Sequence, residues 1–314
     1  MAKETSMGIM VIKPVFVISL DMELAWGFIV NPDDERLTLL RSDPQEGRGT
    51  VSFLLELFER YNIPATWAVV GHLFLDPDGA KESVHREMPQ FKEGWIDWQY
   101  YSEVGRGHLY CGRDIVEKIL ASPLKHEIGL HGFFHIPFSQ CSREVARAEV
   151  EQGIRAASKF GIAPKSFVFP QNKIGHIDVL KEQGIEIYRG ESAHERQNQK
   201  FLSRKFRGAI HQIVASPASV LYKGGIWELP SSTGFCSTEV PFPLRWRARL
   251  GLCRAIQARK FFHIWLHPWN LLMYERLRGD LEDFLAAVAQ KRDRGKIDVM
   301  TMGEIATSLG ERAS

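Results

Sequence analysis

Cysteine is scarce in this sequence, and its spacing excludes two common motifs. The 314 residues include four cysteines, and no two of them form a C-x-x-C pair. Neither a zinc ribbon nor a thioredoxin-type redox motif is therefore present. We interpret the four residues as reduced thiols, which are typical of a cytosolic protein. They are Cys111, Cys141, Cys236 and Cys253.

Long hydrophobic runs are also missing. No stretch of about 18 uncharged apolar residues occurs, so the sequence predicts no membrane-spanning helix. Near the N-terminus, Pro14 interrupts a short apolar run, and no small-residue cleavage site follows an apolar core. We therefore expect no signal peptide and a cytoplasmic location.

Neither sign of charge dominates. The chain has 40 Lys and Arg against 38 Asp and Glu, which gives a net charge of +2. This balance argues against nucleic acid as the main partner. Hydrophobic residues make up 44% and charged residues 25%, an ordinary globular composition. Because no repeat or linker interrupts the chain, we expect a single domain over residues 1–314, with a core at about 14–302.

Short β-rich runs alternate with amphipathic stretches along the chain. Helices are predicted over residues 50–61, 142–160 and 281–292, where apolar side chains recur at the spacing of one helix face. Strands that alternate with helices imply parallel pairing through right-handed crossovers, and their number favours a barrel over an open sheet. The predicted strands cover residues 15–20, 65–70, 127–130, 166–169, 185–188, 226–229, 261–266 and 297–300.

Residues 76–112 break this alternation. The stretch is rich in aromatic residues and is interrupted by glycine and proline. Long structured loops in α/β folds usually lie over the active site. We therefore predict a lid-like insertion here.

Polar side chains gather where the predicted strands end. The site of a parallel barrel is built on the carboxyl ends of its strands. We therefore expect the residues that follow five of the strands to converge on one site. They are Asp21 and Glu23, His131 and His135, residues 170–172, residues 230–232, and His267.

The segment H-E-I-G-L-H-G-F-F-H gives the clearest metal signal. His131 and His135 are four positions apart, just past a strand. In a helical turn this spacing places both imidazoles on one side, where they can share an ion. The alternative is a packed histidine at a strand end with a chance neighbour. We interpret His126, at the start of the segment, as structural.

The segment S-L-D-M-E-L-A-W-G supplies two carboxylates. Asp21 and Glu23 are two positions apart, so in extended chain they point the same way. One can complete a metal site of two histidines and one carboxylate, while the other acts as a base. The alternative is a helix N-cap or a solvated turn.

His267 lies at a later strand end, between Trp265 and Trp269. A histidine in an aromatic setting can act as a general acid near neutral pH. The alternative is a core histidine that is hydrogen-bonded to the backbone. His263 shares the same strand face, and we assign it no role.

Together these residues resemble the NodB-like polysaccharide deacetylases, carbohydrate esterase family four, over residues 15–300. The resemblance implies a distorted (β/α)7 barrel and a metal-dependent amide hydrolase, usually with zinc. It assigns Asp21 as the base, His131 and His135 as metal ligands and His267 as the general acid. Met22 stands where the family has a second aspartate, so Glu23 becomes the third ligand, as in members with a D-x-E form.

Two further positions depart from the family pattern. Gly132 replaces a serine or threonine, so a hydroxyl near the metal is missing. The fourth-strand segment F-V-F-P-Q-N-K-I-G-H lacks the arginine that orients the base, and Gln171, Asn172 and Lys173 are the candidates to replace it. The segment H-E-I-G-L-H is also similar to deformylases that act on a formylated aminoarabinose carried by a lipid.

These features predict removal of an acetyl or formyl group from an amino sugar, in surface-polysaccharide or glycolipid biosynthesis. The alternatives are a cyclic-amide hydrolase acting on a small molecule and a non-catalytic sugar-binding protein. Expected substrate contacts are the segment after the fourth strand and the flat faces of tryptophans. They are Pro170, Gln171, Asn172, Trp227 and Trp269.

Residues 244–260 carry six basic residues and no acid, and they are predicted to form an amphipathic helix. One interpretation is a solvated outer helix of the barrel. The other is peripheral contact with anionic lipid or with a phosphate-linked sugar carrier. The expected partner is thus a carbohydrate, lipid-linked or nucleotide-linked in the second case, with the protein at the inner membrane face.

Overall fold

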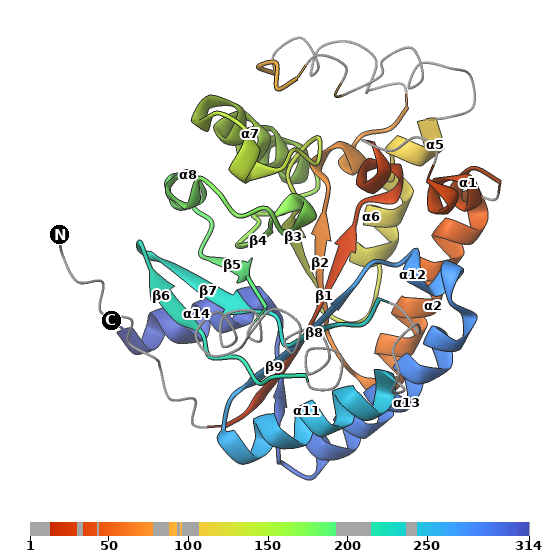
Figure 1. Cartoon of the computed structure of the whole chain (residues 1–314), viewed down its shortest axis with the longest axis vertical. Coiled ribbons are helices and arrows are strands. Elements are labelled where there is room, and N and C mark those ends of the chain that lie inside the picture. Colours follow the sequence, from red (N-terminus) through yellow and green to blue (C-terminus); the bar gives the residue numbers. More distant parts are fainter. Residues whose placement is uncertain are drawn as a thin grey trace, which may run out of the picture.

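Figure 1 shows the computed structural model of the chain, in which helices surround a curled sheet. The structure describes residues 13–29, 34–42, 44–77, 88–92, 95, 107–192, 215–236 and 244–313. Within these ranges every helix is too short or too polar to cross a bilayer.

The described strands form one ten-stranded sheet in the order β6-β7-β5-β4-β3-β2-β1-β9-β8, with β10 paired to β1. Neighbours run parallel, except for the antiparallel pair β6 and β7. The sheet is a curled half-barrel, and the distorted barrel predicted from the sequence is confirmed. The strands are β1 Val15–Met22, β2 Thr66–Val69, β3 Glu127–Leu130, β4 Ser166–Val168, β5 Ile187–Gly190, β6 Leu221–Lys223, β7 Ile226–Pro230, β8 Thr233–Gly234, β9 Phe261–Leu266 and β10 Asp298–Val299.

Helices connect the parallel strands and cover the outer face of the sheet, except for the C-terminal helix, which packs against the apolar end of the inner face. The α-helices are α1 Glu35–Ser42, α2 Pro44–Tyr61, α5 Gly107–Tyr110, α6 Arg113–Leu120, α7 Arg143–Ser158, α8 Ile177–Glu182, α11 Leu244–Ala258, α12 Asn270–Met273, α13 Glu275–Asp293 and α14 Met302–Ala313. Short 3-10 turns follow several strands, namely η1 Leu24–Phe28, η2 Gly71–Phe74, η3 Phe138–Gln140 and η4 Pro170–Asn172.

The alternation of side chains along β1 separates the core from the site. Phe16 and Ile18 face the helices and belong to the main hydrophobic core. Val17 points to the inner face, where it packs with Met302 of α14. Because successive strand residues point to opposite faces, Asp21 lies on the same inner face as Val17, closer to the carboxyl end. The inner face is therefore apolar at one end and polar at the other.

The predicted elements agree with the structure, with informative differences at their ends. The strands predicted at 127–130 and 261–266 match β3 and β9. The helix predicted at 142–160 matches α7, and the Ser142 hydroxyl caps it by accepting a hydrogen bond from the Val145 amide at 3.2 Å. The fifth strand was predicted two residues too early, because β5 ends at Gly190. That shift brings Arg189 into the sheet.

Three other predictions differ or lie outside the described residues. Helices α2 and α13 begin six residues before the predicted ranges 50–61 and 281–292. Strands β6 and β8 were not predicted, because each is only two or three residues long. Most of the insertion at 76–112 lies outside the described residues, so its role as a lid stays a prediction.

Candidate metal centre and catalytic site

Two acids stand at the carboxyl end of β1. Asp21 is the penultimate residue of the strand, and Glu23 is the first residue beyond it. The Glu23 carboxylate leans across the following 3-10 turn, where a Cβ on Gly27 would lie 2.0 Å from Oε1. Only glycine fits at position 27 without displacing this carboxylate. The local sequence therefore sets the direction in which Glu23 points.

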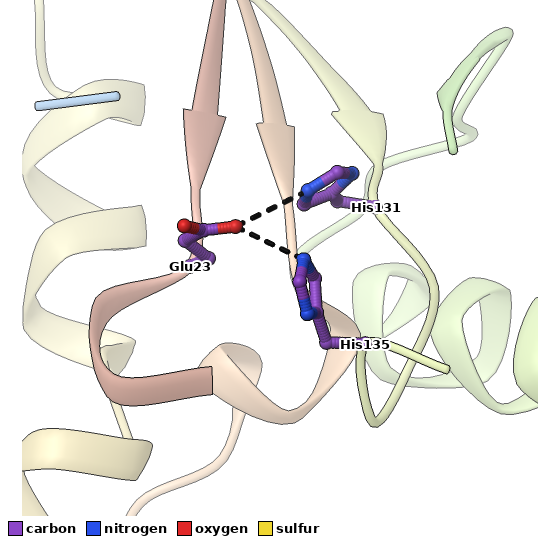
Figure 2. A group of neighbouring side chains, drawn as sticks. All are labelled: Glu23, His131 and His135. Atoms are coloured by element: carbon purple, nitrogen blue, oxygen red, sulfur yellow. Dashed lines mark ion pairs between the residues drawn. The ribbon is translucent and has the colours of Figure 1, made fainter. Parts of the chain in front are cut away.

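Glu23, His131 and His135 form one buried cluster (Figure 2). Glu23 Oε2 lies 3.4 Å from His131 Nε2 and 3.0 Å from His135 Nε2. One potential ligand atom from each residue lies within 4.8 Å of the others. Two imidazoles and one carboxylate in this arrangement match the protein ligands of catalytic zinc sites, which keep a further position open.

His131 is held in the tautomer that a ligand requires. Its Nδ1 lies 2.8 Å from the carbonyl oxygen of Val168 at the end of β4. That carbonyl can only accept, so Nδ1 carries the proton and Nε2 presents a lone pair. Among the described residues, Nε2 has no hydrogen-bond partner. A buried lone pair left open in this way fits a metal ion.

His135 approaches the cluster from an unusual backbone conformation. Its φ is +57°, in the left-handed region that costs energy for a residue with a Cβ. Both of its ring nitrogens are buried and lack hydrogen-bond partners among the described residues. Such groups are costly unless something else satisfies them. The strained backbone and the unpaired nitrogens are both typical of a metal ligand. Glu23, His131 and His135 therefore fit a divalent ion.

The other oxygen of Glu23 has a donor of its own. The Trp269 indole N–H donates to Oε1 at 3.1 Å, and His267 Nε2 lies 3.3 Å from the same oxygen. Burial acts to raise the pKa of Glu23, but His267, His135 and His131 outweigh it and hold the pKa well below its usual value. Glu23 is therefore ionised and oriented on both sides.

The loop that joins the two histidines is held from behind by Glu149 of α7. Its carboxylate accepts from the amides of Phe133 at 2.8 Å and Phe134 at 3.0 Å, with a longer contact of 3.5 Å to Ile136. Burial raises the pKa of Glu149 to about 7, although these amides act in the opposite direction. This carboxyl group lies outside the residues predicted from the sequence.

Asp21 is held by an arginine that sequence reasoning missed. Arg189 of β5 donates from Nη1 and Nη2 to the two oxygens of Asp21 at 2.5 and 2.6 Å. Both side chains are buried. Burial alone would raise the pKa of Asp21, but Arg189, followed by His131 and His267, lowers it. Arg189 occupies the orienting role that we expected from the segment after β4.

The guanidinium of Arg189 is itself fixed on several sides. Nη2 donates to Asn172 Oδ1 at 3.0 Å, and Nη1 lies 3.3 Å from Ser19 Oγ. The ring of Trp265 covers it at 4.6 Å from the guanidinium carbon. Ser19 also contacts His263 Nε2 at 2.9 Å, which ties the buried His263 into the same network. Of the three predicted replacements, Asn172 supports the arginine rather than substituting for it.

His267 lies beside both acids. Its Nε2 is 3.3 Å from Glu23 and 3.9 Å from Asp21. Asn270 Oδ1 accepts from the His267 backbone amide at 2.8 Å and lies 3.3 Å from Nδ1. The ring stacks on Trp269 at a centroid distance of 4.5 Å. Nδ1 is thus directed at an acceptor, and Nε2 faces the site.

The predicted substrate contacts lie in different surroundings. Pro170 is buried, whereas Gln171 and Asn172 are exposed and adopt positive φ values of 54° in η4. Trp269 is mostly buried against Glu23 and His267. Trp227 packs in the inner apolar cluster and against Tyr222, near the start of β7. A role for these residues in substrate binding stays a prediction.

The family comparison covers the middle of the chain. The family model described as polysaccharide deacetylase matches residues 36–187. This range contains both histidines of the cluster, whereas Asp21 and Glu23 precede it and His267 follows it. No protein of curated function matches the sequence significantly.

Solved structures share the fold over nearly the whole chain. A protein from Mycobacterium smegmatis classed as a polysaccharide deacetylase is 16% identical, with a TM-score of 0.63 over 99% of this chain and 95% of that one. One from Pseudomonas aeruginosa, classed likewise, is 13% identical, with a TM-score of 0.58 over 94% and 90%. The PuuE allantoinase is 12% identical, with a TM-score of 0.57 over 94% and 89%. The family match over residues 36–187 and this shared fold support the resemblance of the chain to the NodB-like polysaccharide deacetylases, carbohydrate esterase family four.

Proposed function

We propose that this protein is a metal-dependent hydrolase that removes an N-acyl group, acetyl or formyl, from an amino sugar. The family supports hydrolytic deacetylation of a carbohydrate. One observation supports the more specific proposal. At the same edge of the sheet, the possible metal ligands Glu23, His131 and His135 lie beside a separate ionised acid, Asp21. A site that only bound sugar would need neither.

A divalent ion, zinc in our proposal, would supply Lewis-acid polarisation of the acyl oxygen and a lowered pKa of a bound water. Two histidines and one carboxylate suit this ion, because Zn²⁺ takes mixed nitrogen and oxygen ligands and keeps a position open for substrate. Glu23, His131 and His135 would hold it.

Asp21 is placed to take the proton of the attacking water. Its lowered pKa keeps it ionised, and Arg189 fixes both of its oxygens. As the water oxygen adds to the acyl carbon, its proton passes to the Asp21 carboxylate. Arg189 then faces a neutral acid. After His267 has given its proton to the leaving amine, the proton on Asp21 passes back to His267, whose Nε2 lies 3.9 Å away, so both groups regain their starting protonation states.

His267 is placed to protonate the leaving amine. Asn270 directs Nδ1, so the proton that is transferred is the one on Nε2, which faces Asp21 and Glu23. An amine that leaves without a proton is a very poor leaving group. Cleavage thus yields a carboxylic acid and a free amino sugar.

The test is an acid-release screen with three proteins. Zinc-loaded wild-type protein is incubated with free, nucleotide-linked and lipid-linked N-acetyl and N-formyl amino sugars, and released acetate and formate are measured. We expect turnover of one substrate class, lost in Asp21→Asn and in His131→Ala. Full activity in both variants would contradict the assignment of the site.

A second candidate function is opening of a cyclic amide in a small molecule. The fold similarity to an allantoinase favours it. The same base and acid would act on a ring amide, so the substrate separates the two proposals. Ring opening of a cyclic amide without any release of acetate or formate from sugars would favour this candidate.

A non-catalytic sugar-binding protein is the third reading. Two departures from the family pattern favour it, namely Met22 and the lack of an arginine in the segment after β4. The bidentate pair of Arg189 with Asp21 argues against it, because binding alone requires no buried, oriented base. Bound sugar that is never turned over by the zinc-loaded protein would restore it.

For the substrate carrier, we extend the proposal to peripheral membrane contact through α11, with the protein at the cytoplasmic face. Trp246 is 60% exposed and Leu250, one turn later, is 47% exposed. Arg254 is exposed on the same side and has no ion-pair partner among the described residues. Exposed tryptophan and leucine beside arginine suit the interface of an anionic membrane. This contact would place a lipid-linked sugar of surface-polysaccharide or glycolipid biosynthesis near the site.

Vesicle sedimentation tests this contact. We expect binding to vesicles that contain phosphatidylglycerol, and its loss in a Trp246→Ser/Leu250→Ser double variant. The matched control is Leu120→Ser/Tyr222→Ser, which removes two exposed apolar residues elsewhere. Equal binding of all three proteins would contradict the contact. Reversing the charge of Arg245 would not test membrane binding cleanly, because this residue forms an ion pair with Asp283 of α13.

A further inference from the structure

The loop between His131 and His135 holds its shape under strain. Gly132 has a φ of +71° and His135 a φ of +57°. The left-handed conformation is unfavourable for a residue other than glycine, because its Cβ lies too close to the following carbonyl oxygen. A strained loop persists only where its surroundings over-determine it. The source of that constraint decides how well the two ligands are placed.

Glu149 supplies the constraint from the neighbouring helix. It is fully buried on α7 and accepts three loop amides, those of Phe133, Phe134 and Ile136. The amides of Phe134 and Ile136 lie on either side of His135 in the chain. Their hydrogen bonds to Glu149 fix the direction in which the backbone turns at His135. Buried amides need acceptors, and the oxygens of Glu149 supply them, so the position of the loop backbone depends on this side chain.

The side chain of Glu149 leaves no room for a side chain larger than that of glycine at position 132. A Cβ on Gly132 would lie 2.8 Å from Glu149 Oε2 and 3.1 Å from Pro170 Cγ. The serine or threonine that the resemblance leads one to expect at this position therefore has no room. The space it would occupy is filled by the carboxylate from α7.

We propose that Glu149 is a positioning residue for the metal ligands, which holds His135 in ligand geometry in place of a hydroxyl carried by the loop itself. The inference rests on the metal site of the proposed function, but not on any substrate. Glu149 touches neither the ligand nitrogens nor the reacting groups; it acts through the backbone of the loop. Groups that orient metal ligands typically contribute about 10–100-fold to metal affinity.

The experiment is a zinc titration of the metal-free full-length chain. In Glu149→Gln we expect the zinc dissociation constant to rise about 10–100-fold, because the amide group turns a donor toward the backbone N–H groups. Glu149→Asp keeps a carboxylate and should recover part of the loss. The control is Gln152→Ala, a buried polar residue one turn along α7, which should leave zinc affinity unchanged.

A double-variant cycle separates positioning from general loss of folding. Gly132→Ala should weaken zinc binding in the wild-type background, where its Cβ meets the carboxylate. In the Glu149→Ala background the same change should cost less, since that clash is gone. Circular dichroism checks that each variant is folded, and zinc affinity is compared among the folded proteins.

The outcomes separate this inference from the proposed function. If wild-type protein binds zinc and Glu149→Gln binds it equally well, Glu149 has no positioning role and the proposed function stands. If costs at positions 132 and 149 simply add, the two residues do not act as a unit and the inference is overturned. If wild-type protein binds no zinc, both the inference and the metal-dependent function are wrong.

Discussion

Asp21 and Glu23 lie two residues apart on one strand end, yet they have opposite kinds of partners. Asp21 faces a guanidinium that occupies both of its oxygens. Glu23 faces two imidazole nitrogens with no hydrogen-bond partner and one indole N–H. A permanently charged guanidinium excludes a cation beside Asp21, whereas the imidazole nitrogens beside Glu23 are a type of ligand that binds divalent metal ions. The residues around each acid, rather than the acids themselves, therefore determine which one acts as the base and which one as the metal ligand.

The largest effect is expected from removing the charge of the base. Asp21→Asn keeps the shape of the side chain but can no longer take a proton. We expect kcat to fall about 10²–10⁴-fold, the usual contribution of acid–base catalysis. The measurement is steady-state acid release by the zinc-loaded protein. An unchanged kcat would show that Asp21 is not the base.

Arg189→Met tests the support of the base. Burial would then act on Asp21 without the guanidinium, so its pKa should rise. A base must be unprotonated, so the acid limb of the pH profile of kcat/KM should move to higher pH. Removing one partner of a buried pair also costs about 3–5 kcal/mol, so folding is checked by thermal melting. Arg189→Lys keeps the charge and should shift the limb less; an unmoved limb in both variants would contradict the role.

Gly27→Ala tests the other acid with one methyl group. The new Cβ would lie 2.0 Å from Glu23 Oε1, so the carboxylate must move. We expect zinc affinity to weaken about tenfold, as for other changes that disturb ligand orientation. The control is Gly279→Ala on α13, where a Cβ meets nothing within 4 Å. Equal zinc affinities in the two variants would show that the orientation of Glu23 is unimportant.

A change at His126 is expected to have the smallest effect on the site, because this half-buried histidine lies outside it. Its Nδ1 accepts from the Ala65 amide at 3.1 Å, and burial lowers its pKa to about 4. The unfolded chain binds a proton near pH 6.5 and the folded protein near pH 4, so stability is lost as pH falls through this window. The loss is about 3 kcal/mol at 1.36 kcal/mol per pKa unit.

Denaturant melts of wild-type protein and His126→Asn between pH 7 and pH 4 measure this loss. The variant should show a flatter pH dependence, with zinc affinity unchanged at pH 7. A pH dependence as steep as that of wild type would show that other groups cause it.

Local patterns in the sequence predicted much of the fold and most of the cluster. The runs at 127–130 and 261–266 are bounded by clear signals, and the structure has strands there. The convergence of strand ends followed from parallel topology alone. It brought together Glu23, His131 and His135, with Asp21 and His267 beside them.

The partners of these residues could not be read in the same way. Arg189 is 168 positions from Asp21, and it reaches the acid only because the half-barrel curls β5 toward β1. A signal did exist: Arg189 is two residues after Ile187, so in a strand both share the inner face. The predicted end at residue 188 hid it. Glu149 lies on a helix away from the predicted strand ends, and only three-dimensional packing buries it behind the loop that carries the two histidines.

The most direct test of the account is one zinc titration of metal-free Asp21→Asn and Glu23→Gln, side by side with wild-type protein. The account predicts one zinc ion per chain in wild type, an affinity within a few-fold of wild type in Asp21→Asn, and at least about a 100-fold loss in Glu23→Gln. Equal losses in both variants, or zinc binding that survives Glu23→Gln, would contradict the division between ligand and base.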